Sequence, residues 1–185
     1  MRIFAAAIAV FAAFAALPAR AIVPVEEVRA GVFAQACCGG IGSSKEQGAA
    51  INAEAVFKSP RALSVIGAPR PVAGFTLATD DDATSQIYGG LEWKFDIDRF
   101  FVAGGVGLAF HNGESSRYDP IADADRVDHT IFFGCPVLFR LAGDVGYNVT
   151  ERVSVSLHWN HISNAELCSE NEGLDQMGLR VGLKI

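Results

Sequence analysis

Two segments near the C-terminal end of the chain, residues 152–163 and 175–185, alternate hydrophobic and polar positions. Side chains at every second position of a β-strand point to the same face, so each segment is predicted to be a strand with one apolar face. The apolar faces consist of Val153, Val155, Leu157 and Trp159 in the first strand and of Met177, Leu179, Val181, Leu183 and Ile185 in the second. Small, polar and charged residues occupy the opposite faces. Such strands suit either a sheet over a soluble core or a membrane barrel with a polar lumen.

The same alternation predicts six further strands upstream, separated by loops rich in glycine, proline and aspartate. Their expected ranges are 27–38, 49–58, 71–79, 86–97, 100–110 and 133–149. Connections in the C-terminal half alternate between long (111–132), short (148–151) and long (164–174), as they do in outer-membrane barrels. Charged residues lie in mid-strand on the non-apolar faces, namely Glu92, Lys94, Arg140 and Asp144. Since a narrow lumen can pair such charges, the sequence predicts an all-β chain that forms an eight-stranded antiparallel up-and-down transmembrane β-barrel.

The N-terminal segment predicts how the chain is exported, and the net charge excludes one class of partner. Residues 1–21 begin with a positive charge, continue as an apolar run and end in Ala-Arg-Ala, which predicts a secretory signal peptide. The apolar run is shorter than the roughly 20 residues that a spanning helix needs. Residues 22–185 are then expected to form the barrel domain in the outer membrane. Cleavage leaves 13 basic and 21 acidic residues, a net charge of −8 that argues against a nucleic-acid partner.

Three polar residues interrupt the apolar faces where the two C-terminal strands meet their connecting loop. Continued parity places His161 and Ser163 on the apolar face of the first strand and Asp175 on that of the second. If the hairpin pairs so that residue numbers sum to 336, Asp175 lies opposite His161, within about 5 Å. His161 and Ser163 are separated by roughly 6.6 Å at the backbone. The three types together suit a serine hydrolase, in which a carboxylate orients a histidine that takes the serine proton.

The residues around these three resemble a known family. Residues 161–165, His-Ile-Ser-Asn-Ala, followed by 171–175, Asn-Glu-Gly-Leu-Asp, resemble the signature of outer-membrane lipid A 3-O-deacylases of the PagL type. The resemblance implies that His161 is the general base, Ser163 the nucleophile and Asp175 the third catalytic residue, where the best-known members have glutamate. Asn164, through its backbone N–H or its side chain, and Asn171 become candidates for the oxyanion site.

This resemblance implies hydrolysis of the ester-linked acyl chain at position 3 of lipid A, without a cofactor. The expected partners are lipid A or lipopolysaccharide as substrate and the surrounding outer-membrane lipids. The sequence leaves open whether the chain forms a homodimer. It also leaves two alternative functions: a non-catalytic small barrel with a structural or adhesive role, and a different lipid A enzyme, such as an acyltransferase with an acyl pocket in the lumen.

The remaining reactive side chains receive simpler interpretations. All four cysteines are expected near extracellular strand ends, and an exported chain can oxidise them. Since neighbouring cysteines rarely bond to each other, Cys37 and Cys38 are each expected to pair with one of Cys135 and Cys168. Acidic residues at 80–82 and 119–128 are interpreted as solvated loops, with divalent-cation bridging to lipopolysaccharide phosphates as the alternative. No metal site is expected, because the histidines lack ligand spacing.

Overall fold

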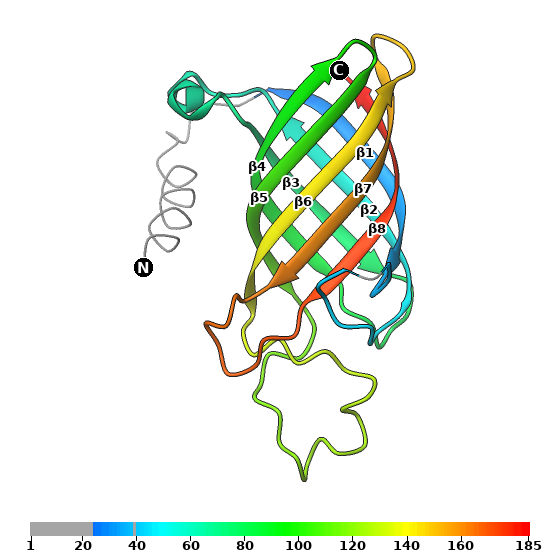
Figure 1. The fold of residues 1–185 in the computed structure, drawn as a ribbon, viewed down its shortest axis with the longest axis vertical. Coiled ribbons are helices and arrows are strands. Elements are labelled where there is room, and N and C mark those ends of the chain that lie inside the picture. The colour runs from blue at the N-terminus through cyan, green and yellow to red at the C-terminus, as the bar shows by residue number, and fades with distance from the viewer. Residues whose placement is uncertain (1–23, 39) are drawn as a thin grey trace.

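The computed structural model describes residues 24–38 and 40–185, so the expected signal peptide over 1–21 lies outside the described residues. Eight antiparallel strands form a closed barrel in sequence order (Figure 1). The strands are β1 (Val25–Gln35), β2 (Gly48–Phe57), β3 (Arg70–Ala78), β4 (Gln86–Ile97), β5 (Phe100–His111), β6 (Val137–Asn148), β7 (Val153–Ser163) and β8 (Leu174–Lys184). The predicted fold class is therefore confirmed.

Strand β1 ends earlier, and strand β6 begins later, than the hydrophobic pattern predicted. β1 ends at Gln35 rather than at residue 38, because Ala36 adopts a left-handed conformation, with φ of 50°, that turns the chain away from the strand. β6 begins at Val137 rather than at residue 133. Pro136 cannot donate to a ladder hydrogen bond, and Gly134 turns the chain with a φ of 71°.

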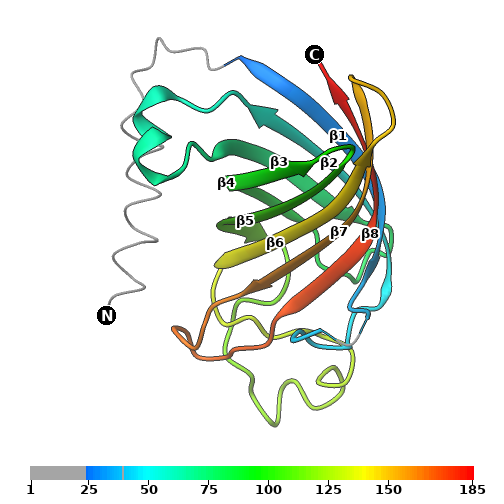
Figure 2. The ribbon, with the colours of Figure 1, turned by 45° about the horizontal axis from the view of Figure 1, so that its top comes forward.

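The two ends of the barrel differ in their connections. Residues 98–99 and 149–152 form tight turns at the end that holds the C-terminus, here called the turn end (Figure 1). The opposite loop end carries the long connections, including 112–136 and 164–173 (Figure 2). The β2–β3 connection, residues 58–69, departs from this division: it lies at the turn end, yet it is long and contains the 3₁₀ helix η1 (Arg61–Ile66).

The outer wall of the barrel is an exposed apolar belt. Odd-numbered residues of β7 and β8 face outward, as predicted, with Leu157 48% and Leu179 66% exposed, whereas His158 on the opposite face is 1% exposed. Other exposed apolar side chains of the wall include Val32, Ile51, Ile87, Phe95, Ile97, Phe100, Val145 and Val181. No helix among the described residues is long and apolar enough to cross a membrane. An outward apolar belt around a polar interior is the arrangement of a barrel in lipid.

Charged side chains fill the lumen and neutralise one another there. Arg29 contacts Glu54 at 3.0 Å and Glu92 at 2.6 Å, and Arg180 joins Glu54 at 3.0 Å to Asp144 at 2.7 Å. The four charged residues predicted to line a lumen, Glu92, Lys94, Arg140 and Asp144, are all on the inward face with little exposed side chain. Because buried charges are costly unless paired, this network accounts for charged residues in the middle of membrane-spanning strands.

An apolar cluster closes the lumen at the loop end. Ile162 and Leu174, the inward residues next to His161 and Asp175, are both fully buried in it. Phe133 and Ile131 enter the same cluster from the β5–β6 connection. The cluster therefore supports the strand ends of β7 and β8 from the inside, on the side opposite to the polar residues singled out by the sequence.

Candidate active site

His161 and Asp175 form a hydrogen-bonded pair on adjacent strands. The register of β7 and β8 places the two residues directly opposite each other, which is the register that the sequence analysis considered, with residue numbers that sum to 336. The distance between His161 Nδ1 and Asp175 Oδ1 is 2.8 Å. A carboxylate can only accept, so Nδ1 is the donor in this contact, and in the neutral imidazole Nε2 then keeps its lone pair. A histidine held in this tautomer is suited to accept a proton through Nε2.

The β1–β2 connection, residues 36–47, covers this pair from outside the barrel. Parity puts His161 and Asp175 on the outward face, yet they are only 5% and 2% exposed. Two backbone hydrogen bonds attach the connection to the start of β8. Ala36 N donates to Asp175 O at 2.8 Å, and Ser43 N donates to Gly173 O at 2.7 Å. Gly42 N donates to Asp175 Oδ2 at 2.6 Å. The pair is therefore shielded from lipid by a loop that the strand pattern did not reveal.

Glycines make the close approach of this loop possible. A Cβ at Gly40 would overlap the Asp175 carboxylate, and one at Gly42 would lie 2.7 Å from Asp175 N. On the histidine side, a Cβ at Gly173 would lie 2.6 Å from His161 Cε1. Only glycine fits at these positions without displacing the pair. The cluster of glycines between two strands was the one sequence signal that pointed to a closely packed element.

Ser163 is the last residue of β7 and shares the outward parity of His161. It pairs with Phe139 of β6 and is partly exposed. Among the described residues, neither the Ser163 hydroxyl nor His161 Nε2 makes a hydrogen bond in this structure. The structure thus brings His161 and Asp175 together and places Ser163 two positions along the same strand. Contacts to a nucleophile are commonly long in the absence of substrate.

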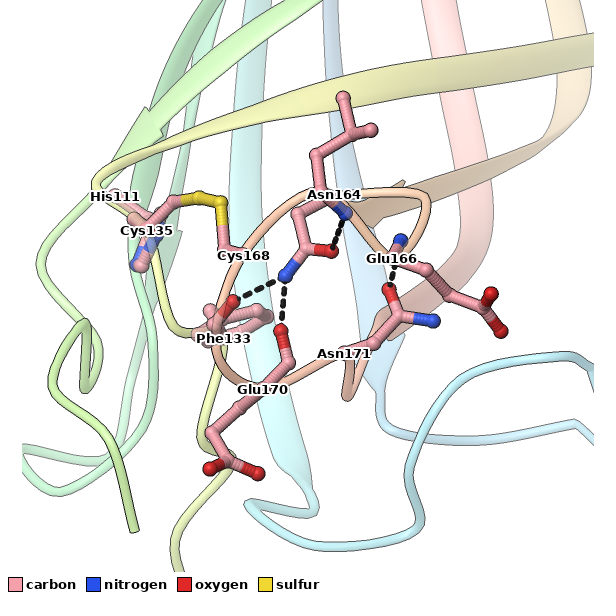
Figure 3. The surroundings of a disulfide bond; sticks show 9 residues. His111, Phe133, Cys135, Asn164, Glu166, Cys168, Glu170 and Asn171 are labelled. Carbon is pink, nitrogen blue, oxygen red and sulfur yellow. Dashed lines mark hydrogen bonds between the residues drawn. A yellow bond between two sulfur atoms is a disulfide. The ribbon is translucent and has the colours of Figure 1, made fainter.

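Asn164 and Asn171, the two oxyanion candidates, both hold the β7–β8 loop in shape. The Asn164 side-chain amide donates to Phe133 O at 2.5 Å and to Glu170 O, and its carbonyl accepts from Leu167 N at 3.1 Å (Figure 3). Asn171 Oδ1 accepts from Glu166 N at 3.0 Å. The Asn164 side-chain amide therefore already donates to the loop backbone. Of the two donors that the sequence analysis considered for the oxyanion, the backbone N–H of Asn164 remains.

The disulfides differ from the pairing expected from the sequence. Cys135 is bonded to Cys168, and Cys37 is bonded to Cys38. The expectation that each of Cys37 and Cys38 joins one of the other two is wrong. The β7–β8 loop packs against the start of β6, where Gly134 approaches the backbone of Glu170, and this contact brings Cys135 and Cys168 together (Figure 3).

Two acidic residues of the β5–β6 connection form ion pairs with the same arginine. Arg126 contacts Glu114 at 2.7 Å and Asp123 at 2.9 Å. Hydrogen bonds from the backbone and side chain of Ser116, followed by the Arg126 contact, lower the pKa of Glu114 to about 2. Within the described part of the chain, no group of three or more potential metal ligands is placed to hold an ion. Ion pairing with Arg126 is therefore a role that the structure gives to Glu114 and Asp123.

Comparisons with known proteins relate this barrel to other membrane proteins. The outer membrane enzyme PagL is 17% identical, with a TM-score of 0.57 over 86% of this chain and 99% of that chain. Neisserial surface protein A is 14% identical, with a TM-score of 0.56 over 86% and 96%. The N-terminal β-barrel domain of Pseudomonas aeruginosa OprF is 11% identical, with a TM-score of 0.52 over 87% and 98%. At these identities, the likenesses show a shared fold.

Sequence comparison gives the more specific result. Curated protein sequences yield no significant match. A family model described as lipid A 3-O-deacylase (PagL) matches residues 75–184, which include β4 to β8 and all three residues of the candidate site. Because this match extends over more than half of the chain, the chain belongs to the PagL family of lipid A 3-O-deacylases.

Proposed function

We propose that this chain is a serine esterase of the outer membrane that hydrolyses the ester-linked acyl chain at position 3 of lipid A. Membership of the PagL family supports lipid A deacylation. The observation that carries the proposal is the 2.8 Å contact between His161 and Asp175, on the strand face that also presents Ser163. A histidine that is hydrogen-bonded to a carboxylate and lies near a serine is the combination of groups that serine hydrolases use.

Each residue has a defined role in the acylation step. His161 Nε2 takes the proton from the Ser163 hydroxyl as Oγ forms a bond to the ester carbonyl carbon. Asp175 accepts the Nδ1 hydrogen bond and stabilises the cationic imidazole that results. When the tetrahedral intermediate collapses, the ester C–O bond breaks and Nε2 returns the proton to the sugar oxygen. The acyl chain remains on Ser163 as an ester.

Water completes the reaction by the same route. His161 Nε2 takes a proton from a water molecule as the water oxygen attacks the acyl carbonyl carbon. Nε2 then gives this proton to Ser163 Oγ as the bond between Oγ and the acyl group breaks and the fatty acid leaves. We assign the oxyanion to the backbone N–H of Asn164, because the side-chain amide of that residue already holds the loop. Asn171 contributes by supporting the same loop through its bond to Glu166. These steps require no cofactor.

The outward position of Ser163 suits a lipid substrate. Its cross-strand neighbour Phe139 and the next outward residue of β6, Leu141, belong to the apolar wall, and Leu141 is 44% exposed. An acyl chain of lipid A can lie along this wall while its ester reaches the strand end. The substrate then stays in the bilayer during the reaction, and no apolar surface has to be transferred to water.

The filled lumen argues against an acyltransferase with an internal acyl pocket. Arg29, Arg180 and their carboxylate partners occupy the space in which such a chain would bind. A non-catalytic barrel is the remaining alternative, and it requires no activity of Ser163. Mass spectrometry of lipid A separates the two. Cells that express the chain should lose the acyl chain at position 3 from lipid A, and cells that express Ser163→Ala should retain it. Unchanged lipid A with the folded parent chain would reject the proposal.

A further inference from the structure

We propose that the η1 segment, residues 58–69, is an interfacial anchor that binds anionic phospholipids of the leaflet at the turn end of the barrel. The other turns at this end are tight, whereas this segment stands outside the wall beside β4 (Figures 1 and 2). Two apolar side chains of η1 are exposed, Val65 at 86% and Ile66 at 49%. The inference depends on the barrel lying in a membrane and not on the esterase site.

A hydrogen bond attaches the η1 segment to the lipid-facing wall. Trp93 shares the outward parity of Phe95 and Ile97 on β4, and its indole Nε1 donates to Ile66 O at 2.9 Å. Gly67, which ends η1 with a φ of 89°, packs so closely that a Cβ there would lie 3.3 Å from Trp93 Nε1. The segment is therefore held against the outside of the barrel at a defined point.

The height of that point places the attachment within the apolar belt, close to its edge at the turn end. Phe95 and Ile97, which are 62% and 64% exposed, lie beyond Trp93 toward the turn end. Four residues of a strand tilted by about 40° advance roughly 10 Å along the barrel axis. The apolar belt therefore continues past the attachment point, and Val65 and Ile66 extend this belt outward where hydrocarbon meets headgroups. Tryptophan is enriched at this depth.

The backbone of the η1 segment suits a poorly hydrated position. Leu63 N donates to Pro60 O at 3.0 Å, Gly67 N to Ser64 O at 3.2 Å, and Ala68 N to Leu63 O at 2.9 Å. Pro60 and Pro69 have no N–H to satisfy. Irregular backbone near hydrocarbon is tolerated only when its polar groups have partners, and these bonds supply several of them.

Charge identifies the lipid class. The chain has a net charge of −6, yet no acidic residue occurs between positions 55 and 79. Lys58 and Arg61 are both exposed at the start of the segment. An apolar pair beside two cations matches the surface of an anionic leaflet, which attracts nearby lysine and arginine side chains. Phospholipids with a net negative headgroup, such as phosphatidylglycerol, are therefore the expected ligands.

Photo-crosslinking tests this assignment directly. The full mature chain, with p-benzoylphenylalanine at position 65, is reconstituted in vesicles of phosphatidylethanolamine and phosphatidylglycerol, irradiated and analysed by mass spectrometry. The matched control carries the same group at position 151, an exposed residue of the β6–β7 turn at the same end. We expect roughly tenfold more phospholipid adduct at position 65 than at position 151, because only the former contacts acyl chains. Equal yields, or adducts formed only with a second copy of the chain, would overturn the anchor.

Two variants separate attachment from lipid preference. Trp93→Phe removes the indole donor but keeps an aromatic ring, and it should lower the adduct yield at position 65 several-fold. The double variant Lys58→Gln/Arg61→Gln should lower the ratio of phosphatidylglycerol to phosphatidylethanolamine adducts by up to roughly 30-fold, since each of the two cations near an anionic surface contributes about 1 kcal/mol. A phosphatidylglycerol share that is unchanged in the double variant would reject the anionic preference. Heat-modifiable migration on gels confirms that each variant is folded.

Discussion

The backbone N–H of Gly42 donates a 2.6 Å hydrogen bond to Asp175 Oδ2, while Oδ1 of the same carboxylate contacts His161. One residue of the β1–β2 connection thus holds the second oxygen of the carboxylate that is proposed to orient His161. A hydrogen bond to the ionised carboxylate keeps it oriented toward the imidazole. The connection therefore acts as a positioning element for the site, in addition to covering it.

Replacing Gly42 tests that relationship. Gly42→Ala places a Cβ 2.7 Å from Asp175 N, so the loop must move and its N–H must leave the carboxylate. We expect kcat for lipid A deacylation to fall by roughly 10- to 100-fold with little change in KM, because only the orientation of the catalytic base is affected. Gly48→Ala is the matched control, since its nearest contact is Asp80 Cβ at 3.9 Å. Equal kcat values in the two variants would contradict the positioning role.

Ser163→Ala should abolish acyl release and leave the barrel folded. Ser163 is a partly exposed strand-end residue, so its hydroxyl contributes to chemistry and not to packing. Loss of a serine nucleophile typically removes about 10⁶-fold of activity. Fatty acid release from purified lipopolysaccharide measures the rate, and heat-modifiable migration on gels reports folding. If most activity persists in the folded variant, Ser163 is not the nucleophile.

Substitutions at Asp175 should show that the length of the acid matters. Asp175→Asn removes the charge that stabilises the cationic imidazole, and we expect a loss of about 10⁴-fold in kcat. The resemblance to a glutamate-containing family would predict that Asp175→Glu is tolerated. The packed structure predicts otherwise, because Gly42 N already lies 2.6 Å from Oδ2 and an added methylene has no room. A fully active Asp175→Glu variant would show that the β1–β2 connection can move to accommodate the longer side chain.

The Cys135–Cys168 disulfide should contribute substantially to stability. It closes a loop with a sequence separation of 33, for which the loop-entropy model gives about 3.7 kcal/mol. The variant Cys135→Ser/Cys168→Ser should therefore unfold at lower denaturant concentration in detergent micelles. Cys37→Ser/Cys38→Ser removes a bond between adjacent residues, so it serves as a control with a much smaller effect. Equal losses in the two variants would refute the entropic account.

The β5–β6 connection should loosen in acid. The pKa of Glu114 is lowered from 4.5 to about 2, so its contacts stabilise the folded loop fully above pH 4.5 and are lost as the pH falls toward 2. Cleavage of the loop by pepsin, followed by mass spectrometry, should increase over this interval. Glu114→Gln should already be cut at pH 5, where the parent chain resists. A cleavage rate independent of pH in the parent chain would exclude this stabilising role.

Local alternation of residue types was enough to predict the barrel. Strand β4 was predicted with its observed bounds, and the inward position of Arg140 and Asp144 followed from parity. The sequence showed that His161 and Asp175 share a face, because a one-residue slip would exchange the two faces of the strand. Their direct pairing was one possible register, and the structure selected it. The faces of these residues depend on the period of the strand, which the sequence displays directly.

Long-range packing was needed for the rest. The cover that the β1–β2 connection provides over Asp175, and the bonding of Cys135 to Cys168, both depend on how loops from separate hairpins meet at one end of the barrel. The η1 helix in the β2–β3 connection was likewise not predicted. Its hydrogen bond from Trp93 joins two segments that are distant in sequence, on the outside of the barrel. Loops lack a repeating pattern, and their conformations are selected by contacts with residues distant in sequence. Those contacts exist only once the barrel has closed.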